Sequence, residues 1–299
     1  MDVDSHEDDF RRVVHDLGPT RFLPASGVEI IRDLSLRQAP RYALFDFDGT
    51  LSLIREGWPG VMVPMMVEVL RATGTGESDE DLSRLVYGFV MELNGKQTVF
   101  QMIRLAEEVR VRGGTPEDPL AYKQMYHDRL MKRIAGRHDA LRSGRVQAED
   151  MLVPGAVEAL SALQERRVVL YLASGTDEEY VVEEARLLGL DHYFGDRIYG
   201  AIDNYKDFSK AMVIDRILNE NKVKGEALLG FGDGYVEILN IKQAGGVAVA
   251  VASDEAGRSG RPDAWKRDRL ISVGADLVVP DFRDCRTLLD YLWSCVEGR

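Results

Sequence analysis

Residues 42–51 read Tyr-Ala-Leu-Phe-Asp-Phe-Asp-Gly-Thr-Leu. An apolar run rich in strand-forming residues ends in Asp46 and Asp48, which alternation places on one side of the chain as it leaves the strand. Gly49 lets the backbone turn away from both carboxylates. Two carboxylates this close repel each other unless a cation or a proton is shared between them. The stretch therefore indicates a hard metal and acid–base chemistry at a strand end; the alternative is an acidic turn that merely closes the strand.

The composition of the chain excludes several classes of protein. Its 299 residues suffice for one large or two modest domains, and 45% hydrophobic with 29% charged residues is ordinary for a globular protein. A formal net charge of −12 argues against a nucleic-acid binder and means that an anionic substrate needs a local cationic pocket. No apolar run has the length of a membrane span, and the acidic amino terminus is unlike a signal peptide. With only Cys285 and Cys295 a disulfide framework is not expected, and we expect a cytoplasmic protein without membrane or nucleic-acid partners.

The apolar pattern predicts an α/β unit interrupted by a helical insert. Residues 1–40 form an N-terminal extension, 42–46 predict a strand, and 58–145 carry helical periodicity alone, in four segments. After Pro154 helices and strands alternate, which is typical of a doubly wound parallel sheet that binds ligands at the carboxyl ends of its strands. We expect these strands at 168–173, 197–200, 227–231, 247–252 and 276–279, and the helices at 156–165, 177–188, 209–220, 234–243 and 284–294. The remaining segment, 253–272, is expected to be a basic surface excursion.

Three later segments carry residue types that Asp46 and Asp48 would need. A predicted strand ends in Ser174-Gly175-Thr176, where a hydroxyl and free backbone N–H groups could cradle a phosphate, or simply cap the next helix. Lys210 opens an amphipathic helix although a lysine there opposes the helix dipole; the alternative is a solvated surface lysine. Another strand ends in Asp233 between glycines, with Glu237 one helical turn further on, which suits an oxygen-rich Mg²⁺ site or an ordinary turn.

These four motifs, in this order and spacing, resemble the haloacid dehalogenase-like hydrolase superfamily. The resemblance covers about 42–52 and 150–295. It implies a Rossmann-like doubly wound parallel core formed by 41–52 and 150–299, interrupted by an all-helical cap domain at 53–149.

The resemblance also implies a role for each motif residue. Asp46 would be the nucleophile that forms an aspartyl-phosphate, and Asp48 the general acid and then the base that activates water. Ser174, Gly175 and Lys210 would hold the phosphoryl oxygens, with Lys206 as an alternative lysine because neither precedes the proline that the family often has there. Mg²⁺ would be bound by Asp46, the backbone carbonyl of Asp48, Asp233 and, directly or through water, Glu237. Phosphoryl transfer needs this positioning and charge neutralisation.

The second aspartate narrows the reaction. Dehalogenating and phosphonate-cleaving members lack an acid at the position of Asp48, so the resemblance favours phosphoryl transfer. Thr50 is common among phosphatases, whereas sugar phosphomutases often carry valine there, so we expect a phosphatase, with a sugar phosphomutase as the alternative. A non-catalytic binding member would be expected to have lost one of the motif residues.

The helical insert is expected to be the lid that selects the substrate. A lid that excludes water suits a small phosphate ester better than a protein substrate. Candidate substrate contacts are Arg55, Glu56 and Lys96, together with their neighbours Trp58, Gln97 and Thr98. Their polar groups favour a sugar or polyol phosphate, with a phosphoglycolate-like substrate or a nucleotide as alternatives.

Overall fold

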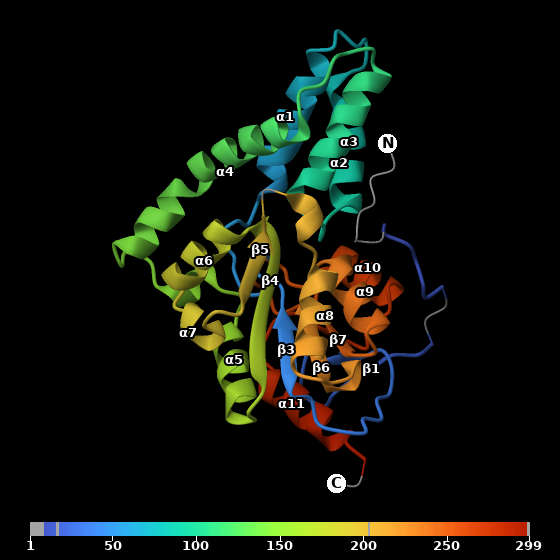
Figure 1. The fold of residues 1–299 in the computed structure, drawn as a ribbon, viewed down its shortest axis with the longest axis vertical. Coiled ribbons are helices and arrows are strands. Elements are labelled where there is room, and N and C mark those ends of the chain that lie inside the picture. Colours follow the sequence, from blue (N-terminus) through green and yellow to red (C-terminus); the bar gives the residue numbers. More distant parts are fainter. Residues whose placement is uncertain (1–8, 16–17, 203, 298–299) are drawn as a thin grey trace.

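The core of the molecule is an eight-stranded sheet with the order β1-β2-β8-β7-β6-β3-β4-β5 (Figure 1). The computed structural model describes residues 9–15, 18–202 and 204–297, so the acidic stretch 1–8 lies outside the described residues. The strands are β1 (Arg21–Phe22), β2 (Glu29–Ile30), β3 (Tyr42–Phe45), β4 (Val169–Asp177), β5 (Ile198–Ala201), β6 (Leu228–Gly232), β7 (Val247–Val251) and β8 (Leu277–Val279). All neighbours from β8 to β5 pair in parallel, which confirms the predicted fold class.

The parallel register brings three predicted motifs to one edge of the sheet. β3 lies between β4 and β6, with Phe45 opposite both Leu172 and Phe231. Phe45 and Phe231 also stack face to face, 4.5 Å apart, in the core below that edge. Because parallel strands end on the same side, the residues that follow these three positions converge there.

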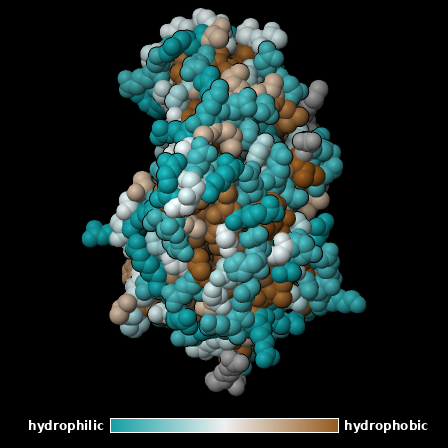
Figure 2. All heavy atoms as spheres, turned by 90° about the vertical axis from the view of Figure 1, so that its left-hand side faces the viewer, coloured by the Kyte–Doolittle hydropathy of each residue, from teal (hydrophilic) through white to brown (hydrophobic). Residues whose placement is uncertain are grey.

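Helices cover both faces of the sheet. The core helices are α5 (Ala156–Glu165), α6 (Glu178–Leu187), α7 (Asp191–Phe194), α8 (Lys210–Glu220), α9 (Tyr235–Gln243), α10 (Ala264–Ser272) and α11 (Cys285–Ser294), with 3₁₀ turns at Ala148–Met151, Tyr205–Asp207 and Gly225–Ala227. One apolar cluster joins the sheet to α5, α6, α7 and α11, and a second joins the opposite face to α8, α9 and α10. Figure 2 shows a mainly hydrophilic surface on the side that carries α4 to α7, consistent with helices that turn their apolar sides inward.

The helical insert consists of α1 (Pro59–Arg71), α2 (Asp79–Glu92), α3 (Thr98–Val111) and α4 (Pro119–Arg142). Ser78 and Asp118 start α2 and α4, and their side chains accept hydrogen bonds from N–H groups of the first turn. The insert stands above the carboxyl ends of the strands, and α4 leads back down beside α6 (Figure 1). In the described part of the chain no helix has the length and apolar character needed to cross a membrane.

Two segments differ from the sequence-based expectation. Part of the N-terminal extension joins the core: β2 pairs with β8, β1 pairs with β2, and the N–H groups of Val13 and Val14 donate to the carbonyl of Ser272 in α10. The prediction that 253–272 forms a basic surface segment is wrong for Lys266, because this residue lies in α10 with only 8% of its surface exposed. Two-residue strands are too short to show an alternating pattern, and charge alone does not reveal which lysine of a helix faces inward.

Candidate active site

Asp46 directly follows β3 and is held rigidly. Its N–H donates to the carbonyl of Phe231 (2.9 Å), and its Oδ1 accepts from the N–H of Phe47 (2.8 Å). The next turn passes close to Asp233: Gly49 has a φ of +74°, and a Cβ on it would stand 2.3 Å from Asp233 Oδ2. Glycine is therefore required here for both conformation and space.

Lys210 is the cation that faces Asp46. Its Nζ lies 2.9 Å from Asp46 Oδ1, and its side chain is almost fully buried. Ser209 caps α8 by accepting from the N–H of Met212, which fixes the helix start that carries this lysine. Burial raises the pKa of Asp46, with Asp233 adding to the rise and Lys210 opposing it. The structure thus brings Lys210 into the site, whereas the ammonium of Lys206 lies 6.0 Å from the ring centroid of Tyr205.

The two acids of the last motif face different partners. Asp233 follows β6, lines the pocket and accepts from Thr50 Oγ1 (3.4 Å). Glu237, in the first turn of α9, is buried and contacts the ammonium of Lys210, but it does not itself line the pocket. Its expected support of a metal ion stays a prediction, and its observed contact is with the lysine.

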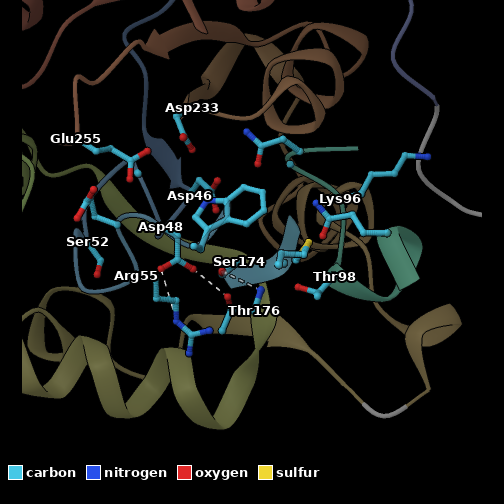
Figure 3. A pocket seen from close by; sticks show the side chains of 18 of the residues that line it. Asp46, Asp48, Ser52, Arg55, Lys96, Thr98, Ser174, Thr176, Asp233 and Glu255 are labelled. Carbon is cyan, nitrogen blue, oxygen red and sulfur yellow. Dashed lines mark hydrogen bonds and ion pairs between the residues drawn. The ribbon is translucent and has the colours of Figure 1, made fainter. Parts of the chain in front are cut away.

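Asp48 lies in a different environment from Asp46. Thr176 Oγ1 donates to its Oδ2 (2.9 Å), and Arg55 Nε lies 3.8 Å from its Oδ1 (Figure 3). Arg55 is fixed by a forked pair of hydrogen bonds to Glu184 in α6, its Nη2 lying 2.8 Å from Oε1. Burial raises the pKa of Asp48 to about 7, although Arg55 partly opposes the rise. A carboxyl group with this pKa can both release and accept a proton near neutral pH.

Ser174 and Gly175 lie beside both aspartates at the end of β4. Ser174 is buried, and its Oγ accepts from the N–H of Thr176 (3.1 Å). Gly175 lies under the insert, since a Cβ on it would meet the carbonyl oxygen of Lys96 at 3.0 Å. Both residues line the same pocket as Lys210, where a phosphate would need hydrogen-bond donors.

The insert closes a cavity of about 100 Å³ over these residues. Its contribution to the lining is aromatic, apolar or uncharged and polar at most positions: Trp58, Met62, Asn94, Gly95, Thr98, Gln101 and Tyr126. Gln97 joins the insert to the core, because its Nε2 donates to the carbonyls of Tyr205 (3.0 Å) and Phe208 (2.8 Å).

The three expected substrate contacts have partners within the protein. Arg55 is held by Glu184, as described above, and Glu56 accepts from Arg137 Nη2 (2.8 Å). Lys96 Nζ lies 2.7 Å from Asp9, and in Figure 3 its side chain extends away from Asp46 and Asp48. All three line the pocket, but their charged groups are bound to other side chains.

Sequence reasoning missed three residues of this site, Glu184, Glu255 and Lys266, and it did not predict the hydrogen bond from Thr176 to Asp48. Lys266 Nζ lies 2.9 Å from Asp233 Oδ2 and 2.6 Å from Glu255 Oε1. Burial lowers the pKa of Lys266, but the attraction of Asp233 and Glu255 outweighs it, so the net shift is upward. One signal could have identified Lys266: it stands one helical turn before the apolar Leu270, hence on the same face of α10.

The site could bind a divalent cation through two side-chain carboxylates and one backbone carbonyl. Asp46 and Asp233 line one pocket and lie close enough for Asp233 to help raise the pKa of Asp46. Among the described residues no three His, Cys, Asp or Glu side chains are grouped so that they could hold a metal. Two carboxylates, a backbone carbonyl and water are nevertheless a donor set that suits Mg²⁺.

Comparison with known proteins identifies the family of the chain. A family model described as haloacid dehalogenase-like hydrolase matches residues 40–245. The chain belongs to this family.

Solved structures place the fold of this haloacid dehalogenase-like hydrolase among phosphatases and phosphomutases. A predicted phosphatase from Clostridium acetobutylicum is 17% identical with a TM-score of 0.56, covering 85% of this chain and 100% of its own. A predicted phosphoglycolate phosphatase from Haemophilus somnus is 17% identical (TM-score 0.51, covering 83% and 97%). A β-phosphoglucomutase from Clostridium difficile is 12% identical (TM-score 0.55, covering 85% and 98%). At these identities the likeness concerns the fold alone, and a search of curated proteins finds no match to the sequence.

Proposed function

We propose that this hydrolase is a Mg²⁺-dependent phosphatase that acts on a small phosphate ester through an aspartyl-phosphate on Asp46. The observation that carries the proposal is the contact of 2.9 Å between Asp46 and the buried ammonium of Lys210. A carboxylate held beside a buried cation at the floor of a small pocket can attack an anionic phosphoryl group, because the cation offsets the repulsion between them.

The first displacement would use both aspartates. Asp46 attacks phosphorus, the bond from phosphorus to the leaving oxygen breaks, and Asp48 gives its proton to that oxygen. Lys210, Ser174 and the N–H of Gly175 would bind the phosphoryl oxygens. The hydrogen bond from Thr176 and the nearby Arg55 would orient Asp48 for this transfer.

The second displacement would release phosphate. Water attacks phosphorus while Asp48 takes a proton from it, the bond from phosphorus to Asp46 breaks, and both aspartates return to their starting states. Asp46, the carbonyl of Asp48 and Asp233 would hold Mg²⁺, with Glu237 behind Lys210. When bound, the ion supplies positive charge that neutralises the phosphoryl group.

The insert would act as the lid of this site and select the substrate. Its contacts through Gln97 and Gly175 close the pocket over Asp46, which would keep water out during the first displacement. The ring of Trp58 and the uncharged polar groups of Asn94, Thr98 and Gln101 favour a sugar or polyol phosphate; a phosphoglycolate-like substrate is the competing candidate.

Two lysines four residues apart provide a matched test. Phosphate release from p-nitrophenyl phosphate with Mg²⁺ should fall on the order of 100-fold or more in Lys210→Ala, the loss typical of a removed electrostatic contact. Lys206→Ala removes the same charge outside the pocket and should keep wild-type activity. Equal activity in the two variants would contradict the assignment. A panel of phosphorylated metabolites, measured with the wild type, would identify the substrate class.

A further inference from the structure

Lys266 lies beside the proposed metal site, but it has no role in the two displacements proposed above. Asp263 starts α10 by accepting from the N–H of Lys266 (2.8 Å), so the side chain leaves the first helical turn toward the sheet edge. There its Nζ donates to Glu255 (2.6 Å) and to Ser253 Oγ (3.1 Å) and pairs with Asp233 (2.9 Å). The ammonium is thus fixed by three oxygen atoms from three different residues.

Glu255 would otherwise be a further carboxylate at the same place. It lines the pocket with Asp46 and Asp233, and its Oε1 would lie 3.0 Å from a Cβ on Gly49, as Asp233 Oδ2 would lie 2.3 Å from it. Figure 3 shows Glu255 and Asp233 near Asp46 around the start of the turn. Ser253 Oγ donates to the carbonyl of Gly49 (2.6 Å), which ties Ser253, and Lys266 through it, to that turn.

The number of available ligand oxygens is one of the features that set which divalent ion a site prefers. Ca²⁺ takes six to eight oxygen ligands in flexible geometry, whereas Mg²⁺ requires an octahedron, keeps several waters and binds one or two carboxylates. Asp46 and Asp233 alone suit Mg²⁺. A free Glu255 beside them would add one or two ligand oxygens and suit Ca²⁺.

We propose that Lys266 makes the site selective for Mg²⁺ by engaging Glu255 and one oxygen of Asp233, which keeps Glu255 out of the metal's ligand set. This inference rests on the proposed function, because it assumes that Asp46 and Asp233 bind a metal ion. Lys266 acts through the two carboxylates and is a positioning residue.

The test measures metal binding directly, by calorimetric titration of the chelator-treated, full-length protein with Mg²⁺ and with Ca²⁺. In Lys266→Met, Ca²⁺ should bind on the order of tenfold more tightly relative to Mg²⁺ than in the wild type, the scale of effect typical of residues that position metal ligands. The double variant Lys266→Met/Glu255→Gln should lose this gain, because the added ligand is gone.

A matched control is Lys242→Met. Lys242 is also a partly buried lysine paired with a carboxylate, Asp276 (2.7 Å), but it does not line the pocket, and its loss should leave the ratio unchanged. Lys266→Gln serves where the methionine variant does not fold, as judged by thermal unfolding.

Three results would overturn the inference. A folded Lys266 variant with a wild-type ratio of Ca²⁺ to Mg²⁺ affinity would do so while leaving the proposed function intact. A double variant that keeps the full gain in Ca²⁺ affinity would exclude Glu255 as the added ligand. A wild-type protein that binds neither ion would remove the metal site itself, and with it part of the proposed function.

Discussion

Asp46 and Asp48 are two residues apart, yet their side chains have opposite partners. Asp46 faces the buried ammonium of Lys210, whereas Asp48 accepts from the hydroxyl of Thr176 and lies near Arg55. About a quarter of the surface of the Asp48 side chain is exposed, so its carboxylate can contact a ligand in the pocket. This difference supports the division of roles that we propose, with one aspartate as nucleophile and the other as proton carrier.

The raised pKa of Asp48 gives a prediction for stability. The unfolded chain releases this proton near pH 3.8 and the folded protein near pH 7, so in that window the folded state binds more protons. Stability is therefore lost as pH rises through the window. Asp48→Asn should remove this loss. In the presence of chelator, the melting temperature of the variant relative to that of the wild type should therefore rise as the pH increases from about 4 to about 8. Asp196→Asn, which removes an exposed carboxylate outside the pocket lining, serves as the control substitution. A constant difference between Asp48→Asn and the wild type across this range would contradict the shift.

Gly49→Ala tests the close approach of the turn to Asp233. Both Gly49 and Gly74 have a positive φ, +74° and +78°, but a Cβ on Gly74 would meet no atom within 4 Å. Each alanine variant should lose about 1 kcal/mol or more of stability from the backbone alone. Only Gly49→Ala should also lose the proposed phosphatase activity, because the new methyl group displaces Asp233. Equal activity in both variants would show that the contact has no part in the site.

At the scale of elements, the helical insert is held against the core by contacts outside the reacting groups. Gln97 binds two carbonyls of the core segment that precedes α8, and Arg269 of α10 donates to the carbonyl of Glu92 in α2. The guanidinium of Arg269 also lies 3.8 Å from the ring centroid of Phe10, so part of the N-terminal extension packs at the same junction. These contacts hold the insert against the core above the pocket.

Gln97→Leu should weaken this closure. Two carbonyls near α8 lose their donor at a cost of about 1–3 kcal/mol, so kcat/KM for p-nitrophenyl phosphate should fall roughly tenfold or more. Gln124→Leu is the control, because Gln124 is exposed on α4, where its Nε2 donates to the nearby carboxylate of Asp128. An unchanged kcat/KM in Gln97→Leu would mean that this contact does not govern closure.

The sequence predicted the parts of the site that regular elements carry. Asp46 and Asp233 directly follow parallel strands and Ser174 lies near the carboxyl end of a third, and parallel strands must end at one edge of the sheet. Lys266 and Glu255 were missed because they follow the next strand, β7, through a loop and a helix whose inward face depends on tertiary packing. For the same reason the sequence could place Arg55 near the site but not its pairing with Glu184 of α6.

At the scale of the whole molecule, the charge of −12 contrasts with the site. Three cationic side chains, Arg55, Lys210 and Lys266, are buried at or beside the pocket, and each of them pairs with a carboxylate. The lining of the pocket also carries the acids Asp46, Asp48, Glu56, Asp233 and Glu255, so the local cationic pocket that we expected for an anionic substrate stays a prediction. The overall fold does not decide between a phosphatase and a phosphomutase, because solved structures of both kinds resemble this chain.

The products of the reaction separate these two activities. With a hexose phosphate and a bisphosphate activator present, we expect inorganic phosphate and free sugar, because the second displacement uses water. Phosphorus NMR of the reaction mixture measures both products. If an isomerised sugar phosphate forms without release of phosphate, the protein is a phosphomutase and the proposed phosphatase activity is wrong.

The central claim is that Asp46 carries the phosphoryl group. Intact-protein mass spectrometry after rapid acid quench during turnover tests it most directly, with peptide mapping to locate the modification. We predict that the wild type gains the mass of one phosphoryl group on Asp46 and that Asp46→Asn, with activity reduced at least about 1,000-fold, gains none. Wild-type turnover without any covalent phosphoryl group, or equal labelling of Asp46→Asn, would contradict the account.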